Sequence, residues 1–460
     1  MEERLHYKLK LLKSIKMQIP QSVSKILKRK LLELLSSTEW LKVLLEEGLY
    51  KFEQLLYEAV LSLYDQIIKS LIDYLIKSKL FEKIQRALAK EKDLKKLRTR
   101  PVQLQLRTGT KIRFDSLYAK KVPIDHEGTR HLSLIALRSS DGASPMYKSI
   151  CCLQSVLCPS FDVTESLLRY QGIKANSNRI RSVSLSLAKD AMKERTTVQL
   201  EQGESLKGKH VIIAIDGGRT RTKVYTNEKK SKRDQEFDTP WREPKMFVIT
   251  TYDEQGRISK ERKPIYDGTF GDKEMVNLLS QYLQELEIDK AASVQVLADG
   301  ALWIWNRVIP MLQELGVEKE KIIETLDYYH GIEHLNDLKA YLEKDQDKLF
   351  GKLKDSLWQG DIKKMERLLK KGIPNLDIKE FKPFEYFTKN LKRIDYQTLK
   401  EQGRVCGSGI IESGIRRIIN LRFKSPSTFW FPENVEKLIF MRGIALSGRW
   451  EIMMNNLNSW

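Results

Sequence analysis

The sequence predicts an α/β fold whose core is a mixed sheet, with an all-helical insertion in that core and a mainly helical N-terminal region. Three observations predict it. Residues 1–96 carry apolar side chains at helical spacing. Residues 207–330 alternate short β-branched runs with helical patterns, which is typical of a sheet with connecting helices. Residues 331–400 are rich in Lys, Asp and Glu and show no strand pattern.

The first region, residues 1–97, is expected to be helical. Its clearest helix covers apolar positions from Phe52 to Ile76, which recur at i, i+3, i+4 and i+7. One interpretation is a helix that faces the core of its own domain, and another is a seam between two copies of the chain. The lysine-rich stretches on either side of it are candidates for contacts with phosphates.

Residues 98–150 are expected to form a small basic β element. Val102–Arg107 and Lys111–Phe114 alternate in polarity on either side of Thr108-Gly109-Thr110, which predicts a hairpin. The basic face of this hairpin is either a contact for nucleic acid or a solvated surface, and the pattern favours neither.

Residues 151–200 predict a helix-turn-helix-like segment. One helix is expected at 161–170 and a second at 177–192, with Asn176 or Ser177 as its N-cap. In DNA-binding segments of this shape the second helix enters the major groove, which would put Arg179 and Arg181 near the bases. Helix pairs with a glycine turn are common and most bind nothing, so this remains a hypothesis.

The core is expected in two pieces, residues 207–330 and 401–446, separated by the helical insertion at 331–400. The first piece predicts strands at 209–216, 245–252, 261–267, 293–299 and 321–326, with helices at 272–286 and 301–315. Residues 447–460 are expected to be a C-terminal tail.

Composition points to an anionic partner. Lys and Arg number 81 against 61 Asp and Glu among 460 residues, a formal charge of +20, which suits nucleic acid. The 4 cysteines show no disulfide framework, and Cys151, Cys152 and Cys158 do not complete a zinc site. No apolar run approaches the ~18 residues of a membrane span. A reducing, cytoplasmic location, with association to the nucleoid, is therefore expected.

Three acids stand in positions suited to catalysis. Asp216 and Asp299 each end an apolar run, and Glu412 lies in a turn of small residues before a basic helical pattern. An aspartate at the end of a strand is often only a turn former. Two such carboxylates in one sheet repel each other unless a cation lies between them, and Mg²⁺ is the natural choice for oxygen ligands.

The stretches around these acids resemble a known family. They are Ala214–Gly218, Ala298–Trp305, Leu326–Leu335 and Gly407–Ser413, followed by Asn420–Trp430. Together they resemble DDE-type insertion-sequence transposases, nearest to the ISKra group, whose core is ribonuclease H-like with an all-α insertion. The resemblance covers roughly residues 160–446. Any one stretch is a weak signal, whereas the combination is specific.

The resemblance implies roles for these residues. Asp216, Asp299 and Glu412 form the metal-binding DDE triad, which holds Mg²⁺ or Mn²⁺ for phosphodiester chemistry. His330, in an Asp-x-x-His motif, reaches the phosphate or orients a nucleotide; a strand-end histidine satisfied by hydrogen bonds is the alternative.

Basic and aromatic side chains near the acids are candidate DNA contacts. Arg219, Arg221 and Lys223 follow the first acid, and the third is followed by Arg416, Arg417 and Arg422. A solvated basic face is the alternative for each. A tryptophan such as Trp430 is more often a core residue than a base-stacking one, but the loop around it favours stacking on an unpaired base.

The function expected is that of a DNA transposase, which binds double-stranded element ends and a target, cleaves strands and transfers them. Joining two ends demands at least a dimer on DNA, and no membrane role is expected. Two alternatives remain: a nuclease of the same fold that only hydrolyses, and a non-catalytic DNA-binding protein derived from a transposase.

Overall fold

The computed structural model describes residues 24–25, 28–29, 32, 38–126, 128–226, 236–342, 346–373, 375–378, 380–407, 409–424 and 428–458. Most of residues 1–37, part of the region expected to be helical, lies outside this set. The chain divides into two compact units: Met1–Leu187 with Asn458–Trp460, and Ala188–Leu457. Each unit is described by itself.

In the described part of the first unit, the continuous segment from residue 38 contains the helices α3 (Thr38–Glu46), α4 (Leu49–Lys77) and α5 (Lys79–Glu91). Helix α4 is the long amphipathic helix that the sequence predicts. Ile68, Ile72 and Ile76 in its second half pack against the buried side chains of a β-hairpin, whereas Tyr50 in its first half is exposed. The core-facing interpretation therefore holds for the second half of the helix.

The hairpin consists of β1 (Lys95–Gln105) and β2 (Lys111–Lys121), paired antiparallel from Lys95–Lys121 to Gln105–Lys111. It is longer than the alternating pattern of the sequence indicates. Ile112 and Phe114 are buried, and they alternate with Lys111 and Arg113, which are exposed. This alternation is what a sheet packed on one face produces.

Further helices of the first unit are α6 (Leu132–Ala136), α7 (Pro145–Leu157), α8 (Phe161–Tyr170) and α9 (Ser177–Ala191), whose residues from Ala188 onward belong to the second unit. The two helices expected at 161–170 and 177–192 are confirmed. Asn176 is the cap of the second, because its Oδ1 accepts the Arg179 N–H at 2.8 Å. Helix α7 shares a core with both through Tyr147 and Cys151, so the pair is part of a three-helix cluster. All four cysteines of the chain are free.

The second unit is built on a five-stranded mixed sheet. Its strands are β3 (His210–Gly217), β8 (Pro244–Tyr252), β9 (Ile265–Phe270), β10 (Ser293–Ala298) and β11 (Ile322–Leu326). The order is β11-β10-β3-β8-β9. Strand β10 is parallel to both neighbours, and β8 is antiparallel to β3 and to β9. The α/β class with a mixed sheet is thus confirmed.

One strand differs from its expected position. The sequence predicts a strand at 261–267, and β9 starts at Ile265. Pro264 precedes it and has no N–H to give to a ladder. Arg262 is instead held by an ion pair with Glu204, at 2.7 Å between Nη2 and Oε1. The strand therefore begins after the proline.

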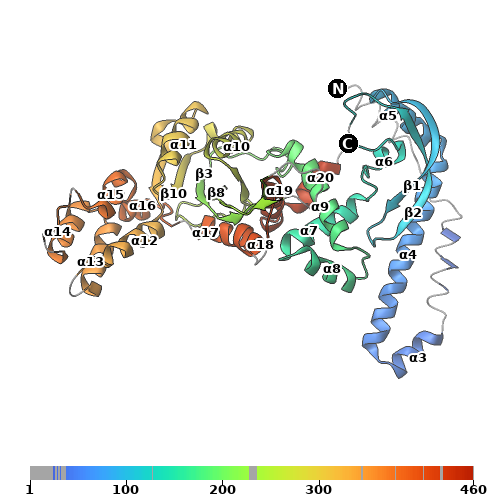
Figure 1. The fold of residues 1–460 in the computed structure, drawn as a ribbon, viewed down its shortest axis with the longest axis horizontal. Coiled ribbons are helices and arrows are strands. Elements are labelled where there is room, and N and C mark those ends of the chain that lie inside the picture. The colour runs from blue at the N-terminus through green and yellow to red at the C-terminus, as the bar shows by residue number, and fades with distance from the viewer. Residues whose placement is uncertain are drawn as a thin grey trace. The chain divides into compact units, whose positions relative to one another are not determined.

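Helices cover both faces of the sheet. Helices α10 (Asp272–Glu285) and α11 (Leu302–Glu314) lie on one side, and α17 (Gly409–Ile415) lies on the other (Figure 1). Val211, Ile213 and Ile215 of β3 belong to the core under α10 and α11. Helix α19 (Pro432–Leu446) packs on β9, where Gly443 lies against the backbone of Tyr266. Burial on both faces explains the continuous apolar run of β3.

The insertion is helical throughout its described residues. It comprises α12 (Tyr328–Lys339), α13 (Gln346–Trp358), α14 (Ile362–Gly372), α15 (Lys382–Lys389), η4 (Leu391–Arg393) and α16 (Tyr396–Glu401). These helices gather at the β10–β11 edge of the sheet (Figure 1) and have a hydrophobic core of their own, with Leu338, Leu353 and Phe387 buried in it. Their start and end are close, since the Tyr328 N–H donates to the Cys406 carbonyl at 3.1 Å.

Two small ribbons follow β3. Strand β4 (Thr220–Arg221) pairs with β7 (Trp241–Arg242), and β5 (Val224–Tyr225) pairs with β6 (Phe237–Asp238). The remaining elements are η1 (Met192–Glu194), η2 (Ile288–Lys290), η3 (Lys319–Lys321), the π-helical turn η5 (Arg416–Asn420), α18 (Leu421–Phe423) and α20 (Trp450–Asn458).

Residues 447–458 are part of the packed structure, although a tail is expected at 447–460. Arg449 is buried and its guanidinium bonds both carboxylate oxygens of Glu204 at 2.8 Å. Trp450 and Met453 of α20 are buried as well. Among the helices of the described ranges, each is too short or too polar to cross a bilayer.

Candidate active site at the ends of three strands

Three adjacent strands carry an aspartate at matched positions of their carboxyl ends: it is the penultimate residue of β3, and it directly follows the last residues of β10 and β11. Ile215 of β3 pairs with Ala298 of β10, and Ala298 pairs with Leu326 of β11. The next residues are Asp216, Asp299 and Asp327, and they occupy equivalent positions at one edge of the sheet. Neighbouring strands are ~4.8 Å apart, so the backbones at these three positions are close neighbours.

The environment of Asp216 disfavours its charge. Burial raises its pKa to about 6, and the negative charges of Asp299 and Asp327 add to the rise. The Gly217 N–H, which donates to Asp216 Oδ1 at 2.6 Å, and the nearby His330 act in the opposite direction. A carboxylate in this setting gains from a cation placed beside it.

Asp299 is tied to its own turn. Its Oδ1 accepts the Ala301 N–H at 2.9 Å, which holds one oxygen toward the backbone at the start of α11. The side chain is partly exposed. The turn-forming interpretation of this aspartate is therefore correct for one oxygen, and it leaves the other available to a ligand.

Asp327 and His330 form a tightly bonded pair. Asp327 is 1% exposed and caps α12, since its carboxylate accepts the backbone N–H groups of Tyr329 and His330. Its Oδ2 is also 2.6 Å from His330 Nδ1. This hydrogen bond, with the charges of Asp327 and Asp216, raises the pKa of His330 to about 9. At neutral pH the imidazole is a cation whose Nδ1 is engaged and whose Nε2 remains to donate.

The helical insertion forms one side of this site. The ring of Tyr386 on α15 packs against Gly300, where an added Cβ would be 2.4 Å from Tyr386 Cε2. His334 on α12 stacks on that ring, with 3.7 Å between centroids. Burial raises the pKa of Tyr386, and Asp299 and Asp327 raise it further. The Gly300 position thus needs a residue without a side chain.

Glu412 comes to the sheet from a different element. It lies on α17, which packs on β3 and β8, and its side chain is exposed. Gly218, just after β3, fits against Ile415 and Ile419, so α17 and η5 lie over the end of β3. Within the described ranges, no three His, Cys, Asp or Glu side chains are arranged to hold a metal ion. The structure brings Asp216, Asp299, Asp327 and His330 into mutual interaction and does not bring Glu412 into that group.

The basic residues after Glu412 have different placements. Arg416 is exposed, and Arg417 Nε donates to the Ser413 carbonyl at 3.3 Å. Arg422 differs from the surface cation expected of it, because it is 2% exposed and lies 4.8 Å from the centroid of the Trp430 ring. Trp430 itself is 8% exposed and packs edge-on against Phe423. Both side chains are part of the core, so in this structure they do not face a nucleic acid.

The basic residues after Asp216 lie on the ribbons, among aromatic rings. Arg219 and Arg221 are exposed, and the Arg221 guanidinium lies 5.3 Å from the centroid of Trp241. Lys223 Nζ is 3.9 Å from the centroid of Phe237. Trp241 is 54% exposed. We call this surface the aromatic ribbon; its members are Arg221, Lys223, Tyr225, Phe237, Trp241, Phe429 and Phe431.

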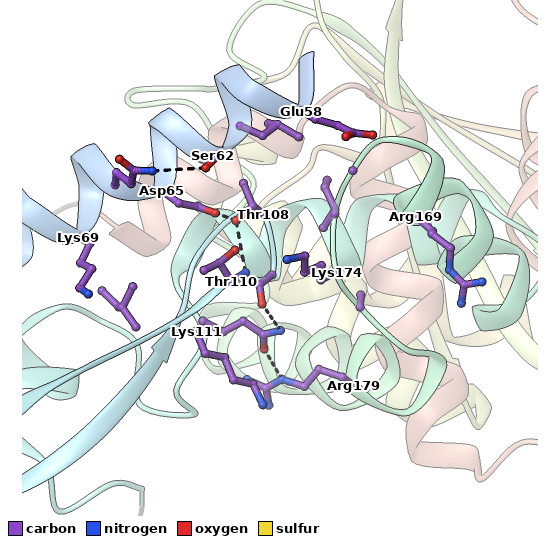
Figure 2. Close-up of a pocket in the computed structure, with 18 of the residues that line it drawn as sticks. Glu58, Ser62, Asp65, Lys69, Thr108, Thr110, Lys111, Arg169, Lys174 and Arg179 are labelled. Carbon is purple, nitrogen blue, oxygen red and sulfur yellow. Dashed lines mark hydrogen bonds between the residues drawn. The ribbon is translucent and has the colours of Figure 1, made fainter. Parts of the chain in front are cut away.

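The two arginines of α9 in the first unit have different surroundings. Arg181 is exposed. Arg179 bends toward the hairpin, where its Nε donates to Gln105 Oε1 at 2.9 Å (Figure 2). Its Nη2 donates to the Asp141 carbonyl at 3.3 Å. A side chain that reads bases points away from its own domain, whereas Arg179 is bonded to the hairpin.

Three features of the site go beyond the residues singled out from the sequence. Asp327 is the first residue of the Asp-x-x-His motif that ends at His330. It directly follows the strand expected at 321–326, as the other two acids stand at the ends of their strands. Tyr386 gives no local signal, because only tertiary packing brings α15 to Gly300. The exposed Trp241 lies in a two-residue strand that is too short for a periodic pattern.

Comparisons with known proteins give only weak structural likeness. No model of a protein family matches the sequence, and no curated protein matches it significantly. Among solved structures, the Drosophila P element transposase strand transfer complex is similar with a TM-score of 0.25 and 11% identity, over 69% of this chain and 83% of that one. Overlap at this level establishes neither fold nor activity.

Proposed function

We propose that this protein is a DNA transposase with a ribonuclease H-like core. The observation that carries the proposal is the register of β3 and β10, which puts Asp216 and Asp299 side by side at the carboxyl ends of adjacent parallel strands. The strand order β11-β10-β3-β8-β9, with β8 alone antiparallel to its two neighbours, supports the ribonuclease H-like assignment. An all-helical insertion between β11 and α17 fits the ISKra-like plan.

The chain's own groups suit a divalent cation. Asp216 and Asp299 present carboxylate oxygens, the ligand type of Mg²⁺ and Mn²⁺. Burial raises the pKa of Asp216 to about 6, so a cation beside it would stabilise its charged form. Glu412 is proposed as the third acid. A bound cation would supply charge stabilisation at the scissile phosphate. Asp327 is assigned the role of orienting His330, because its oxygens accept hydrogen bonds from the start of α12 and its Oδ2 is bonded to the His330 ring.

His330 is proposed to hold a phosphate oxygen. Its Nδ1 is bonded to Asp327, which fixes the ring and leaves Nε2–H as a donor on a side chain that is 32% exposed. A protonated imidazole is a charge-assisted donor toward a phosphate oxygen. Asp327 is thus a positioning residue.

The aromatic ribbon is proposed to contact DNA near the cleaved end. Exposed rings stack on unpaired bases, and the cations beside them contact the backbone. Arg219, Arg221 and Lys223 remain proposed contacts, together with Arg416, Arg417 and Arg181. Double-stranded element ends and a target are the proposed substrates, bound by at least two copies of the chain.

The test is cleavage and strand transfer on DNA that carries the element's own flanking ends, with Mg²⁺ or Mn²⁺. Asp299→Asn keeps an acceptor for the Ala301 N–H and removes the charge, so folding and DNA binding should persist while cleavage is lost. Glu412→Gln should behave in the same way. Glu314→Gln, an exposed acid near the end of α11, is the matched control and should cut normally.

The products separate the proposed function from its alternatives. Nicked and joined products from wild type, absent in Asp299→Asn, are expected of a transposase. Nicks without joining favour a nuclease that only hydrolyses. DNA binding without any cleavage by wild type favours a non-catalytic DNA-binding protein. Equal cutting by wild type and Asp299→Asn would remove Asp299 from the active site.

A further inference from the structure

The first unit contains a hollow of ≈ 1390 Å³ that has no part in the site described above. Three segments form it: the middle of α4, the turn between β1 and β2, and the connection between α8 and α9 (Figure 2). We call it the hairpin groove. Its lining residues all lie within the first unit.

Hydrogen bonds hold the three segments together. Thr108 Oγ1 in the hairpin turn donates to Asp65 Oδ1 of α4 at 2.6 Å. The Tyr57 hydroxyl of α4 donates to the Gln171 carbonyl after α8 at 3.2 Å. The Lys174 N–H donates to the Thr108 carbonyl at 2.7 Å. Each segment is therefore bonded to the other two, and the groove has a defined shape.

Two glycines allow this close approach. Gly109 has φ +84°, and a Cβ there would be 1.9 Å from the Lys174 carbonyl oxygen. Gly172 has φ +71°, and a Cβ there would be 2.6 Å from Leu61 Cδ1. Both conformations favour glycine. The sequence therefore specifies the contact between the hairpin turn and the α8–α9 connection.

The lining of the groove is strongly cationic. Its basic members are Lys69, Lys111, Arg113, Arg169, Lys174 and Arg179, against only Glu58 and Asp65 as acids. Arg169 is paired with Glu165. Lys69, Lys111 and Lys174 are exposed and form no ion pair with any described side chain. Three uncompensated ammonium groups from three different segments thus border one groove.

We propose that the hairpin groove binds the sugar-phosphate backbone of duplex DNA. Ammonium groups on a concave surface match a line of phosphates. The lining contains no aromatic residue, so it offers neither stacking for unpaired bases nor an anchor for a lipid surface. Arg179 helps to build the groove through Gln105, so the α8–α9 pair contributes to a composite backbone site. This inference goes beyond the proposed function, because the groove lies in the unit without the catalytic acids.

The experiment is fluorescence anisotropy with a short labelled duplex of random sequence, in EDTA, over a range of salt concentrations. The groove variant combines Lys69→Ala, Lys111→Ala and Lys174→Ala. The control variant combines Lys79→Ala, Lys83→Ala and Lys90→Ala, three exposed lysines of α5 that do not line the groove. Both variants lose the same charge, and thermal melts establish that both are folded.

The groove variant is expected to weaken binding and to lower the slope of log K against log salt by about 2.7, or about 0.9 for each lost phosphate contact. The control variant should keep the wild-type slope. An unchanged slope in the groove variant, or an equal fall in the control, overturns the proposal. Lost binding to anionic vesicles with unchanged DNA binding overturns it too, in favour of a lipid surface. Because EDTA prevents cleavage, the result does not depend on the proposed catalysis.

A second measurement uses the wild-type chain. Bound duplex should protect Lys69, Lys111 and Lys174 from acetylation, as read by mass spectrometry, and should leave Lys79, Lys83 and Lys90 reactive. Equal reactivity of the two sets in the complex would contradict the assignment.

Discussion

Because Asp327 is hydrogen-bonded to His330, the variant Asp327→Asn is predicted to change the pKa of His330. Asparagine keeps an oxygen to accept the N–H groups at the start of α12, so the helix cap survives, while the negative charge is removed. The pKa of His330 should then fall from about 9 to about its ordinary value of 6.5, because the hydrogen bond to Asp327 is the largest cause of the rise.

The associated free energy follows from the two pKa values. A rise from 6.5 to about 9 corresponds to about 3.4 kcal/mol if nothing screens the interaction. The imidazole is 32% exposed, and solvent screening reduces the expected contribution to about 1–2 kcal/mol. Because the folded pKa lies above the unfolded one, this stabilisation is fully present below pH 6.5 and is lost as pH rises through about 9.

Two assays check this prediction. A titration of the His330 ring signals by NMR should show the lower pKa in Asp327→Asn. Urea unfolding should show a stability difference between wild type and variant that is largest below pH 6.5 and closes above pH 9. A ring that still titrates near 9 in the variant, or a stability difference that does not change with pH, would refute the reasoning.

Three further predictions concern other parts of the chain. Arg195→Ala should lower the free energy of unfolding by about 3–5 kcal/mol in urea, because Asp267, bonded at 2.8 and 2.7 Å, would stay buried without its cation; a loss under ~1 kcal/mol would contradict this. Gly109→Ala should lower the free energy of unfolding by at least about 1–3 kcal/mol from backbone strain alone. It should also weaken duplex binding, because the added Cβ displaces Lys174. An unchanged melting temperature and an unchanged affinity would count against this prediction. Trp241→Ala should leave the melting temperature unchanged and weaken single-strand binding roughly fivefold, about 1 kcal/mol, and equal affinity would remove this ring from the DNA contacts.

The sheet could be predicted from the sequence because its strands are buried on both faces. Buried parallel strands are continuous apolar runs, and β3 and β10 match their expected ranges within a residue. The two aspartates at their ends follow from the same pattern. The start of β9 cannot be predicted as closely, because the residues before it, Glu261 to Pro264, are polar and end in a proline.

The rest depends on contacts between distant segments. The sequence around Trp430 indicates an exposed loop, whereas the ring packs on Phe423 and Arg422 in the core. Glycine turns and an N-cap predict α8 and α9 correctly, but they cannot show that Arg179 turns toward Gln105 across 74 positions of the chain. Local periodicity carries no information on such pairings.

The hydrogen bond between Tyr328 and Cys406 has a consequence for how this chain can change. The insertion leaves the sheet and returns to it at one place, where Gln295 also bonds the Val405 backbone. Because its ends are so close, lengthening the loops of the insertion costs little loop entropy. We expect the pairing of β3 with β10 to tolerate such changes, since it does not depend on the insertion. Such changes would alter the contact between Tyr386 and Gly300, beside the acids. Changes in the insertion can therefore alter the surroundings of the aspartates at the strand ends while the aspartates themselves stay in place.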